Sequence, residues 1–361
     1  MASTRKPKRA DRAACDLLPR LRAQLADIVP PCSRILVALS GGVDSVVLLD
    51  LLHRLAARRR WQLSALHVNH QLQPQAGEWA TFCRRICREA GVPLRVVKVN
   101  VAAGNSIEAA ARVARYEALL RQPAQFIALA HNRDDQAETV LLHLFRGAGI
   151  RGLAGMRMLA DPPFAAPRRR STPSPRMLRP LLDVPREEIV RYATRRKLEW
   201  IDDPTNASCD FTRNFLRVEV LPRVAQRFPS CRAALARAAR HAAEASELLD
   251  ELARQDIPSG GADHALTVAS LRALTPARAK NALTHFLREQ GVDIPSTERL
   301  EEALRQVLAA RADARVCIDL GARQLRVHRG AVVLALSADA ARPLERLWTG
   351  ESHIELPELG G

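Results

Sequence analysis

Apolar runs of strand length alternate with amphipathic stretches along the first part of the chain. The runs are apolar at nearly every position, which is typical of buried parallel strands, and the stretches between them have the spacing of helices packed on a sheet. We predict strands at residues 35–39, 63–70, 94–101 and 126–131, and helices at residues 43–52, 78–90, 106–120 and 134–145. The alternation predicts an α/β fold built on a doubly wound parallel sheet.

The pattern becomes mainly helical from residue 213 onward. An Ala- and Arg-rich stretch at residues 230–256 predicts one long helix, which ends before Gly260 and Gly261. We predict two further helices and then three short strands, at residues 275–290, 296–310, 316–320, 324–328 and 331–336. Together these elements predict a second, smaller α+β domain.

Composition refines the domain boundaries. Residues 1–14 are basic and carry no apolar pattern, and residues 16–29 predict a short amphipathic helix. Residues 151–180 are rich in Arg and Pro, and we interpret them as a basic, partly disordered loop, at whose end residues 177–183 return to the sheet. We therefore expect a basic arm with a leading helix, a catalytic domain, a smaller helical α+β domain and a tail, at residues 1–33, 34–220, 221–340 and 341–361.

The charge of the chain indicates a polyanionic partner. The formal net charge is +16, and only five of the 55 basic residues are Lys. Arg suits phosphate and base recognition through its planar guanidinium, although a basic solvated surface is the alternative. Aromatic residues make up 4% of the chain, which disfavours a stacking platform for single strands and favours a folded RNA contacted through phosphates and shape.

Targeting signals and cysteine spacing indicate the cellular compartment in which the protein works. No apolar run has the length of a membrane span, and no apolar core follows the N-terminal charges, so we expect a cytoplasmic protein without a membrane partner. The seven cysteines are irregularly spaced, and Cys83 and Cys87 have no second pair, which disfavours a zinc or cluster site. We expect reduced, mostly packed thiols.

The first predicted strand ends in a Gly-containing turn that opens a helix. The turn consists of Ser40, Gly41, Gly42, Val43, Asp44 and Ser45. Free backbone N–H groups and the partial positive charge of a helix N-terminus form an anion site, most naturally for phosphate. The spacing is neither that of a Walker loop nor that of Gly-x-Gly-x-x-Gly, and the alternative is a Gly-rich turn without a ligand.

Acidic residues gather where the fourth predicted strand meets its helix. His131 ends the strand, and Asp134 and Asp135 stand four and three residues before Glu138, so that the carboxylates can lie near one another on one helical face. Such a cluster can hold Mg²⁺ against ATP or bind an amine substrate. The structural alternative is capping of the helix N-terminus.

Other polar residues are expected near the same edge of the sheet. Because ligands bind at the carboxyl ends of parallel strands, we expect Ser40, His70 and His131 to share one cleft. His67 and His70 should face opposite sides of their strand, so a shared metal is disfavoured, and a nucleotide-lining role or simple packing is favoured.

The helix predicted at residues 106–120 carries a basic face, which indicates a function less clearly than the loop and the acidic cluster do. Arg112 stands three residues before Arg115 and four before Tyr116, so these side chains share one face of the predicted helix. Taken alone, the stretch is interpreted as a solvated face with an ion pair between Glu108 and Arg112.

The order of these motifs resembles a known enzyme family. The loop at residues 40–45 resembles the signature of the PP-loop ATP pyrophosphatases, which have an adenine nucleotide alpha hydrolase-like fold. The further motifs occur in order at residues 67–70, 108–116, 131–139, 147–156, 179–182, 202–206 and 212–217. This series resembles the tRNA(Ile)-lysidine synthetases, and the later α+β segment resembles their substrate-binding domain more loosely.

The resemblance implies an ATP-dependent ligation on RNA. ATP adenylates the 2-carbonyl oxygen of the wobble cytidine in the CAU anticodon of tRNA(Ile), and pyrophosphate leaves. The ε-amino group of free L-lysine then displaces AMP. The implied cofactors are ATP and Mg²⁺, the implied partners are this tRNA and lysine, and a homodimer is compatible with the family.

The resemblance also assigns roles to residues. Residues 40–45 are expected to hold pyrophosphate, with Asp44 as a magnesium ligand and with His67 and Asn69 lining the nucleotide site. The expected catalytic residues are Asp44, Arg112, His131, Asp134, Asp135 and Glu138, among which the last three acids suit lysine and His131 is one candidate base. The residues expected to contact the tRNA or to shape the cleft are Arg115, Tyr116, Arg151, Arg179, Asp203, Asn206, Arg213, Asn214 and Arg217.

Two features depart from the family pattern. Gln71 and Gln73 stand where many relatives have Gly and Arg, so an Arg contact is not expected there. The chain ends soon after Leu336, where longer relatives carry a further domain.

The alternative functions are those of another PP-loop enzyme acting on tRNA, such as a thiolase, and of an inert tRNA-binding protein. The scattered cysteines disfavour the first, and the intact loop with its acidic cluster disfavours the second.

Overall fold

The computed structural model describes residues 16–71, 73–99, 107–162, 174–202, 212–257, 266–292, 296–311, 316–321 and 323–337. The chain divides into two compact units, residues 1–246 and 247–361. This division lies inside a helix, whereas composition suggested a boundary at residue 220. The start of that helix belongs with the first unit because Arg232 and Arg240 form ion pairs with Asp134 and Asp183.

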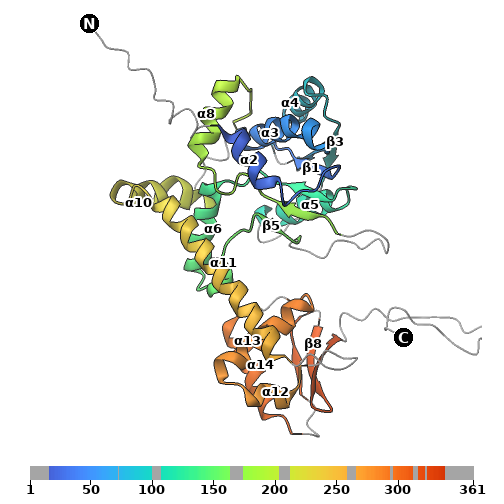
Figure 1. The fold of residues 1–361 in the computed structure, drawn as a ribbon, viewed down its shortest axis with the longest axis vertical. Helices are drawn as coiled ribbons and strands as arrows, with labels where there is room; N and C mark the ends of the chain where they lie inside the picture. Colours follow the sequence, from blue (N-terminus) through green and yellow to red (C-terminus); the bar gives the residue numbers. More distant parts are fainter. Residues whose placement is uncertain are drawn as a thin grey trace, which may run out of the picture. The chain divides into compact units, whose positions relative to one another are not determined.

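A six-stranded sheet forms the centre of the first unit (Figure 1). The strand order is β3-β2-β1-β4-β6-β5, and every neighbouring pair is parallel except β5 with β6. The strands are β1 (Arg34–Ala38), β2 (Gln62–Asn69), β3 (Leu94–Lys98), β4 (Phe126–Ala128), β5 (Leu159–Ala160) and β6 (Arg176–Leu178). The prediction of a doubly wound parallel sheet is confirmed.

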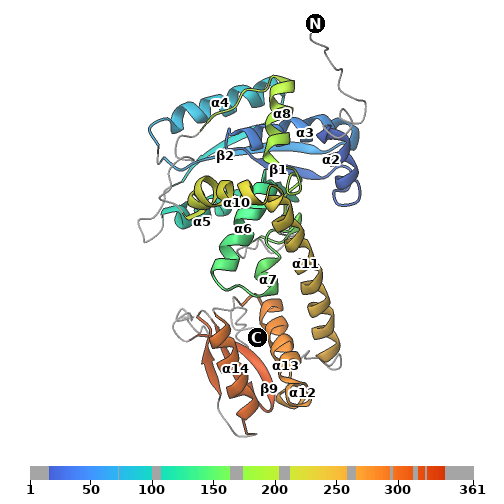
Figure 2. The ribbon, with the colours of Figure 1, turned by 90° about the vertical axis from the view of Figure 1, so that its left-hand side faces the viewer.

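Helices cover both faces of this sheet (Figure 2). One face carries α2 (Leu17–Leu25), α3 (Val43–Arg59), α4 (Ala76–Glu89) and α8 (Arg186–Arg196), and the other carries α5 (Ile107–Leu120) and α6 (Arg133–Phe145). The central strand shows why β1 is apolar throughout. Ile35 and Val37 pack into the core under α3, whereas Leu36 packs into the core under α5 with Tyr116. A strand covered on both faces has no polar side.

The segment interpreted as a partly disordered loop contains ordered elements. It holds α7 (Ile150–Leu153) and β5, for which the interpretation as a loop is wrong, and β6, which agrees with the predicted return of residues 177–183 to the sheet. Residues 163–173 lie outside the described chain. One contact that orders this segment is made by Gln136 of α6. Its side-chain amide donates to the Met156 carbonyl oxygen at 3.0 Å and accepts from the Met156 N–H at 2.9 Å. Composition does not reveal such a link between a helix and a distant loop.

The first unit continues into a helical connection. It consists of α9 (Thr212–Phe215), the π-helix η2 (Leu216–Val220), α10 (Leu221–Arg227) and the beginning of α11 (Cys231–Asp256). A π-helical turn is rare and frequently occurs near functional sites. Here it carries Arg217, which reaches the acidic helix described below.

The second unit is a small α+β domain, as predicted. Its antiparallel sheet has the order β7-β8-β9. Leu283, Leu304 and Leu325 are among the side chains of its core. The elements are α12 (Val268–Ala273), α13 (Pro276–Glu289), α14 (Thr297–Ala309), β7 (Cys317–Asp319), β8 (Arg323–His328) and β9 (Ala331–Leu336). Within the described parts of both units, no helix combines the length and apolar character needed to cross a membrane.

Candidate active site

A cavity of about 510 Å³ lies at the carboxyl ends of β1, β2 and β4. Ser40, His70 and His131, which we expected to share one cleft, all line it. Gln71 and Gln73 also line it. The position agrees with the general rule that ligands of parallel sheets bind beyond the carboxyl ends of the strands.

The predicted phosphate loop is held by hydroxyl groups. Ser45 Oγ accepts from the Gly41 N–H at 3.1 Å and donates to the Gly42 carbonyl oxygen at 2.9 Å. Ser40 Oγ donates to Ser45 Oγ at 3.1 Å and accepts from the Gly42 N–H at 3.3 Å. Gly42 is the N-cap of the 17-residue helix α3 and provides no side-chain cap, and Gly42, Asp44 and Ser45 at this helix start line the cavity.

Gly41 is required by backbone conformation and by space. Its φ of +95° lies in the region that side chains disfavour. A Cβ atom there would also stand 2.9 Å from Ile201 Cδ1 and 3.4 Å from Cys83 Sγ. The Ile201 N–H donates to the Gly41 carbonyl oxygen at 3.0 Å, which fixes the loop against the segment after α8.

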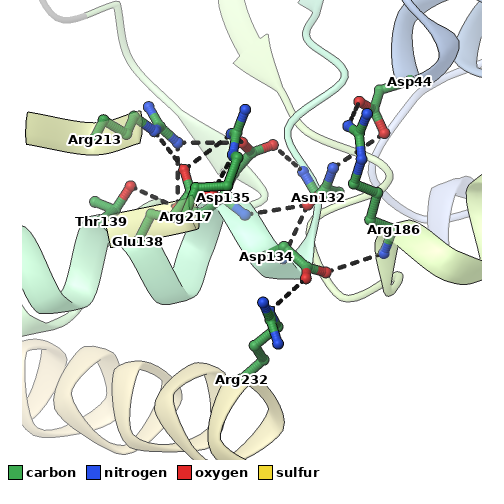
Figure 3. Close-up of polar contacts among 10 residues, drawn as sticks. All are labelled: Asp44, Asn132, Asp134, Asp135, Glu138, Thr139, Arg186, Arg213, Arg217 and Arg232. Atoms are coloured by element: carbon green, nitrogen blue, oxygen red, sulfur yellow. Dashed lines mark hydrogen bonds and ion pairs between the residues drawn. The ribbon is translucent and has the colours of Figure 1, made fainter. Parts of the chain in front are cut away.

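Asp44 occupies the first turn of α3 and lines the cavity. Its Oδ1 accepts from Asn132 Nδ2 at 3.0 Å, and its Oδ2 accepts from Arg186 Nη1 at 2.6 Å (Figure 3). Burial raises the pKa of the Asp44 carboxyl, and the nearby Arg186 guanidinium opposes that increase. The carboxylate is therefore placed and compensated by two residues that sequence analysis did not single out.

Asn132 caps α6 and reaches Asp44 at the same time. Its Oδ1 accepts from the N–H groups of Asp134 and Asp135 at 2.9 and 3.1 Å. Its own N–H donates to Asp135 Oδ2 at 2.9 Å, which completes a capping box. The remaining side-chain N–H group is the one that binds Asp44. A capping Asn is visible in the sequence, but its partner 88 positions away is not.

The acidic residues of α6 lie together but do not line the cavity. The Glu138 side chain is only 1% exposed, and its two oxygens accept from Arg213 Nε and Arg217 Nε, each at 2.7 Å. Arg217 and Arg213 also pair with Asp135 Oδ1, at 3.1 and 3.3 Å (Figure 3). The structural alternative of helix capping therefore applies to Asp135, which takes part in the capping box. Arg213 and Arg217 pair with both Asp135 and Glu138.

The two aspartates differ in environment. Burial raises the pKa of Asp135 to about 6, while Arg213 lowers it and Glu138 raises it further. Asp134 is more accessible, with 22% of its side chain exposed. Its Oδ1 pairs with Arg232 Nε at 2.8 Å, and its Oδ2 accepts from the Arg186 backbone N–H at 3.0 Å.

Three histidines line the cavity. The Nδ1 atoms of His70 and His131 are buried without a hydrogen-bond partner among the described residues. Burial, followed by the charges of Arg179, Arg213, Arg115 and Arg112, holds the pKa of His131 well below its usual range. Burial therefore favours the neutral form of His131, whose Nδ1 has no hydrogen-bond partner among the described residues.

His67 and His70 both line the cavity. His67 Nδ1 is 3.5 Å from Cys83 Sγ on α4, whereas His70, just beyond the end of β2, lies near Arg115 on α5. His67 Nδ1 is 2.9 Å from the Leu39 carbonyl oxygen, and burial lowers the pKa of His67. Asn69 lines the cavity and stabilises the following loop, because its Nδ2 donates to the Ala76 carbonyl oxygen at 3.1 Å.

The basic stretch on α5 is not simply a solvated face. Tyr116 is buried, and the guanidinium carbons of Arg112 and Arg115 stand 5.3 and 5.9 Å from its ring centroid. Arg115 and Tyr116 line the cavity. Arg179 is also buried, donates to the Arg157 carbonyl oxygen at 2.9 Å and bonds to Tyr116, and burial lowers its pKa. The side chain of Glu108 lies outside the described residues.

The remaining candidates are separated from the cavity or not described. Arg151 Nη1 is 3.5 Å from Ser246 Oγ, and Asn214 lies on α9 between the two arginines that bind Glu138. Asp203 and Asn206 fall in residues 203–211, which the structure does not describe.

The described cysteines near the loop are poor nucleophiles. Cys83 and Cys87 are free and buried in α4, as expected. Burial raises the pKa of Cys83 to about 12 and that of Cys87 to about 11. The thiolate forms, which are the reactive ones, are therefore scarce at neutral pH.

Fold and site together define a PP-loop ATP-binding domain. The PP-loop domain family matches residues 17–224, and the family described as the TilS substrate binding domain matches residues 266–333. The U34-tRNA thiolase NcsA from Methanococcus maripaludis has a similar fold, with a TM-score of 0.52 and 20% identity over 64% of this chain and 80% of that one.

Sequence comparison identifies the family. A tRNA(Ile)-lysidine synthase of Nitrosomonas europaea is 38% identical over 94% of this chain and 73% of its own length. That of Azoarcus sp. is 43% identical over 91% of this chain and 71% of its own length. The chain belongs to the tRNA(Ile)-lysidine synthase family.

Proposed function

We propose that the chain is a tRNA(Ile)-lysidine synthase, an ATP-dependent ligase that forms a carbon–nitrogen bond on tRNA. In the first step, the 2-carbonyl oxygen of the wobble cytidine in a CAU anticodon attacks the α-phosphate of ATP, and pyrophosphate leaves. In the second step, the ε-amino nitrogen of lysine attacks C2, and AMP leaves with the former carbonyl oxygen. The amine must be neutral to attack, so a base has to accept its proton.

The observation that carries the proposal is the direct bond between the phosphate loop and the acidic helix. Asn132 binds Asp44 with one end of its side chain and caps the first turn of α6 with the other. The two motifs therefore form a single site, in a chain 43% identical to a protein named tRNA(Ile)-lysidine synthase. Adenylation chemistry and an acidic amine-binding helix are both needed for this reaction.

The loop and the cavity fit ATP with Mg²⁺. The volume of about 510 Å³ lies within the usual range of small-molecule sites. The uncapped N-terminus of α3 can donate N–H groups to phosphate oxygens. Asp44 would repel a phosphate in that position, and a cation between them removes the repulsion. One carboxylate combined with phosphates and water is a common environment for Mg²⁺. When bound, the ion would neutralise charge on the leaving pyrophosphate.

Lysine binding is assigned to the acidic helix, with Asp134 as the leading residue. Every carboxylate of the cluster is paired with an arginine, so the lysine ammonium has to replace a guanidinium. Asp134 is the most exposed of the three, and its partner Arg232 is itself partly exposed. Glu138 and Asp135 instead hold Arg213 and Arg217, and we assign these four residues to shaping the site.

The proton acceptor is assigned from the cavity lining, and the phosphate ligands are assigned from the basic face of α5. His131 is neutral and has an unpartnered Nδ1, so it can accept the proton of the lysine amine. Arg112 and Arg115 are suited to stabilising the negative charge of the transferring phosphate or to orienting the cytidine. The Tyr116 ring packs against both guanidinium groups, and Arg179 bonds to Tyr116. Contacts of Arg151, Asp203, Asn206 and Asn214 with the tRNA remain predictions.

The domain roles complete the proposal. The first unit carries the catalytic site, and the second unit, which matches a substrate-binding domain, is assigned to the tRNA. The charge of +16 supports a polyanionic substrate. A cytoplasmic location and a homodimer remain predictions, the latter to be tested by sedimentation of the purified protein.

The principal alternative is sulfur transfer to tRNA. A thiolase of this fold needs reactive sulfur, and the buried thiols of Cys83 and Cys87 do not provide it, since burial raises their pKa to about 12 and about 11.

Steady-state kinetics with a transcript carrying a CAU anticodon tests the proposal. We expect pyrophosphate release that requires the transcript and Mg²⁺, and incorporation of labelled lysine into the tRNA. Asp134→Asn should raise the KM for lysine more than the KM for ATP. Incorporation of sulfur without lysine would support the alternative, and a protein without nucleotide binding would be an inert tRNA-binding protein.

A further inference from the structure

Arg186 occupies the oxygen of Asp44 that a metal ion needs. Its Nη1 lies 2.6 Å from Asp44 Oδ2, whereas Oδ1 is held by Asn132 (Figure 3). A divalent cation bound to that carboxylate would stand within a few Å of the guanidinium, in a partly buried place where like charges repel strongly. The ion pair and the metal complex therefore exclude each other.

The main chain of Arg186 is fixed while its side chain is accessible. Arg186 is the first residue of α8, and the N-cap residue Pro185 has no side chain able to cap the helix. Asp134 Oδ2 accepts the Arg186 N–H at 3.0 Å and supplies that cap. The side chain, by contrast, is 45% exposed and binds Asp44 as its partner among the described residues. It can change rotamer without moving the helix.

Arg213 and Arg217 lack this freedom. Arg213 and Arg217 each bind both Glu138 and Asp135, and the Glu138 carboxylate is almost completely buried. Releasing one of them would leave a buried charge unpaired, which costs several kcal/mol. Arg186 pairs with a carboxylate that the proposed reaction assigns to Mg²⁺, so its partner changes when the ion binds.

We infer that Arg186 is a phosphate-binding and positioning residue of this site, which neutralises Asp44 in the empty enzyme and transfers to the pyrophosphate portion of ATP when Mg²⁺ binds Asp44. The transfer needs no long movement, because Asp44 lies in the same helical turn whose N–H groups are proposed to bind the phosphates. A guanidinium forms strong, charge-assisted hydrogen bonds with phosphate oxygens. The inference rests on the proposed function only in requiring ATP with a divalent cation.

Binding measurements on Arg186→Gln test the inference without an activity assay. Mn²⁺, detected by electron paramagnetic resonance, serves as the probe of Asp44 in the absence of nucleotide. We expect the variant to bind Mn²⁺ about fivefold more tightly than wild type, because the competing charge is removed. We expect it to bind a non-hydrolysable ATP analogue with Mg²⁺ about tenfold more weakly, measured by calorimetry, because a phosphate ligand is lost.

The matched control is Arg191→Gln, an exposed arginine on the same helix. It should leave both affinities at the wild-type value, and thermal unfolding should show that both variants are folded. Weaker binding of both probes to Arg186→Gln would mean that Arg186 only stabilises the loop, and unchanged binding of both would mean a surface ion pair without a role. Either result overturns the inference. A wild-type protein that binds no ATP analogue at all would overturn the proposed function as well, and so is distinguished from these two results.

Discussion

The side-chain amide of Asn132 donates a 3.0 Å hydrogen bond to Oδ1 of Asp44. The bond joins the first turn of α3 to the N-cap of α6, and both helices follow strands at the centre of the sheet. Asp44 is therefore oriented by a residue whose own position is fixed by two backbone N–H groups. Outer partners of this kind commonly affect metal affinity or activity by roughly 10- to 100-fold.

Replacing Asn132 separates its two tasks. Asn132→Ser keeps a good N-cap but is too short to reach Asp44, so the Tm should change little while pyrophosphate release falls by about 10-fold or more. Asn132→Ala removes the cap as well and should lower the free energy of unfolding by about 1 kcal/mol. The assay is tRNA-dependent pyrophosphate release over a range of Mg²⁺ concentrations. Full activity of Asn132→Ser would contradict the positioning role.

The two loop glycines should respond differently to Ala. Gly41→Ala places a Cβ at φ +95° and 2.9 Å from Ile201 Cδ1, and we expect a loss of about 1–3 kcal/mol in the free energy of unfolding. Gly42→Ala meets only ordinary contacts, with Ser40 Oγ at 3.6 Å the nearest, and is the matched control. Urea unfolding of the nucleotide-free proteins compares them. Equal losses for the two variants would show that the loop is not constrained as described.

Glu138 should be essential for stability. Glu138→Ala leaves Arg213 and Arg217 without their shared partner, and we expect a loss of about 3 kcal/mol in the free energy of unfolding. Glu219→Gln is the control, because Glu219 forms an exposed ion pair with Arg223, and its removal should change stability by less than about 1 kcal/mol. Chemical denaturation at neutral pH measures both. Similar small effects of the two changes would argue against the buried network.

His131 should make stability depend on pH. Its pKa in the folded protein is held well below 6.5 by burial, whereas the unfolded chain takes up the proton near pH 6.5. The contribution to stability is thus present above pH 6.5 and decreases below it by up to about 1.4 kcal/mol per pH unit. The stability of wild type minus that of His131→Asn should be constant from pH 7 to 8 and should fall from pH 6.5 to 5. A difference that does not change with pH would contradict a buried, neutral imidazole.

Local signals were sufficient for the fold and for the strand–turn–helix geometry of the loop at residues 40–45. The alternation of apolar runs predicted β1 to β4 and the helices between them, because each element depends mainly on its own residues. The loop at residues 40–45 was predicted for the same reason: its glycines, hydroxyls and helix start are contiguous. β5 was missed, since a two-residue strand carries no periodicity.

The electrostatic partners could not be predicted. Arg213 and Arg217 reach α6 from more than 70 positions away, and the chain has 55 basic residues among which sequence alone does not choose. The acidic residues therefore appeared free for a ligand, whereas each is paired. The same reason concealed Arg186, whose importance arises only from its distance to Asp44.

Mass analysis of the tRNA after reaction tests the central claim most directly. The purified protein is incubated with ATP, Mg²⁺, lysine and a transcript carrying a CAU anticodon, and the nucleosides are then separated. We predict that the wobble cytidine is converted to lysidine, and that Asp44→Ala lowers the conversion by about 100-fold or more, because the charge proposed to bind Mg²⁺ is lost. An unmodified cytidine in the presence of all substrates, or a sulfur-containing product, would contradict the account.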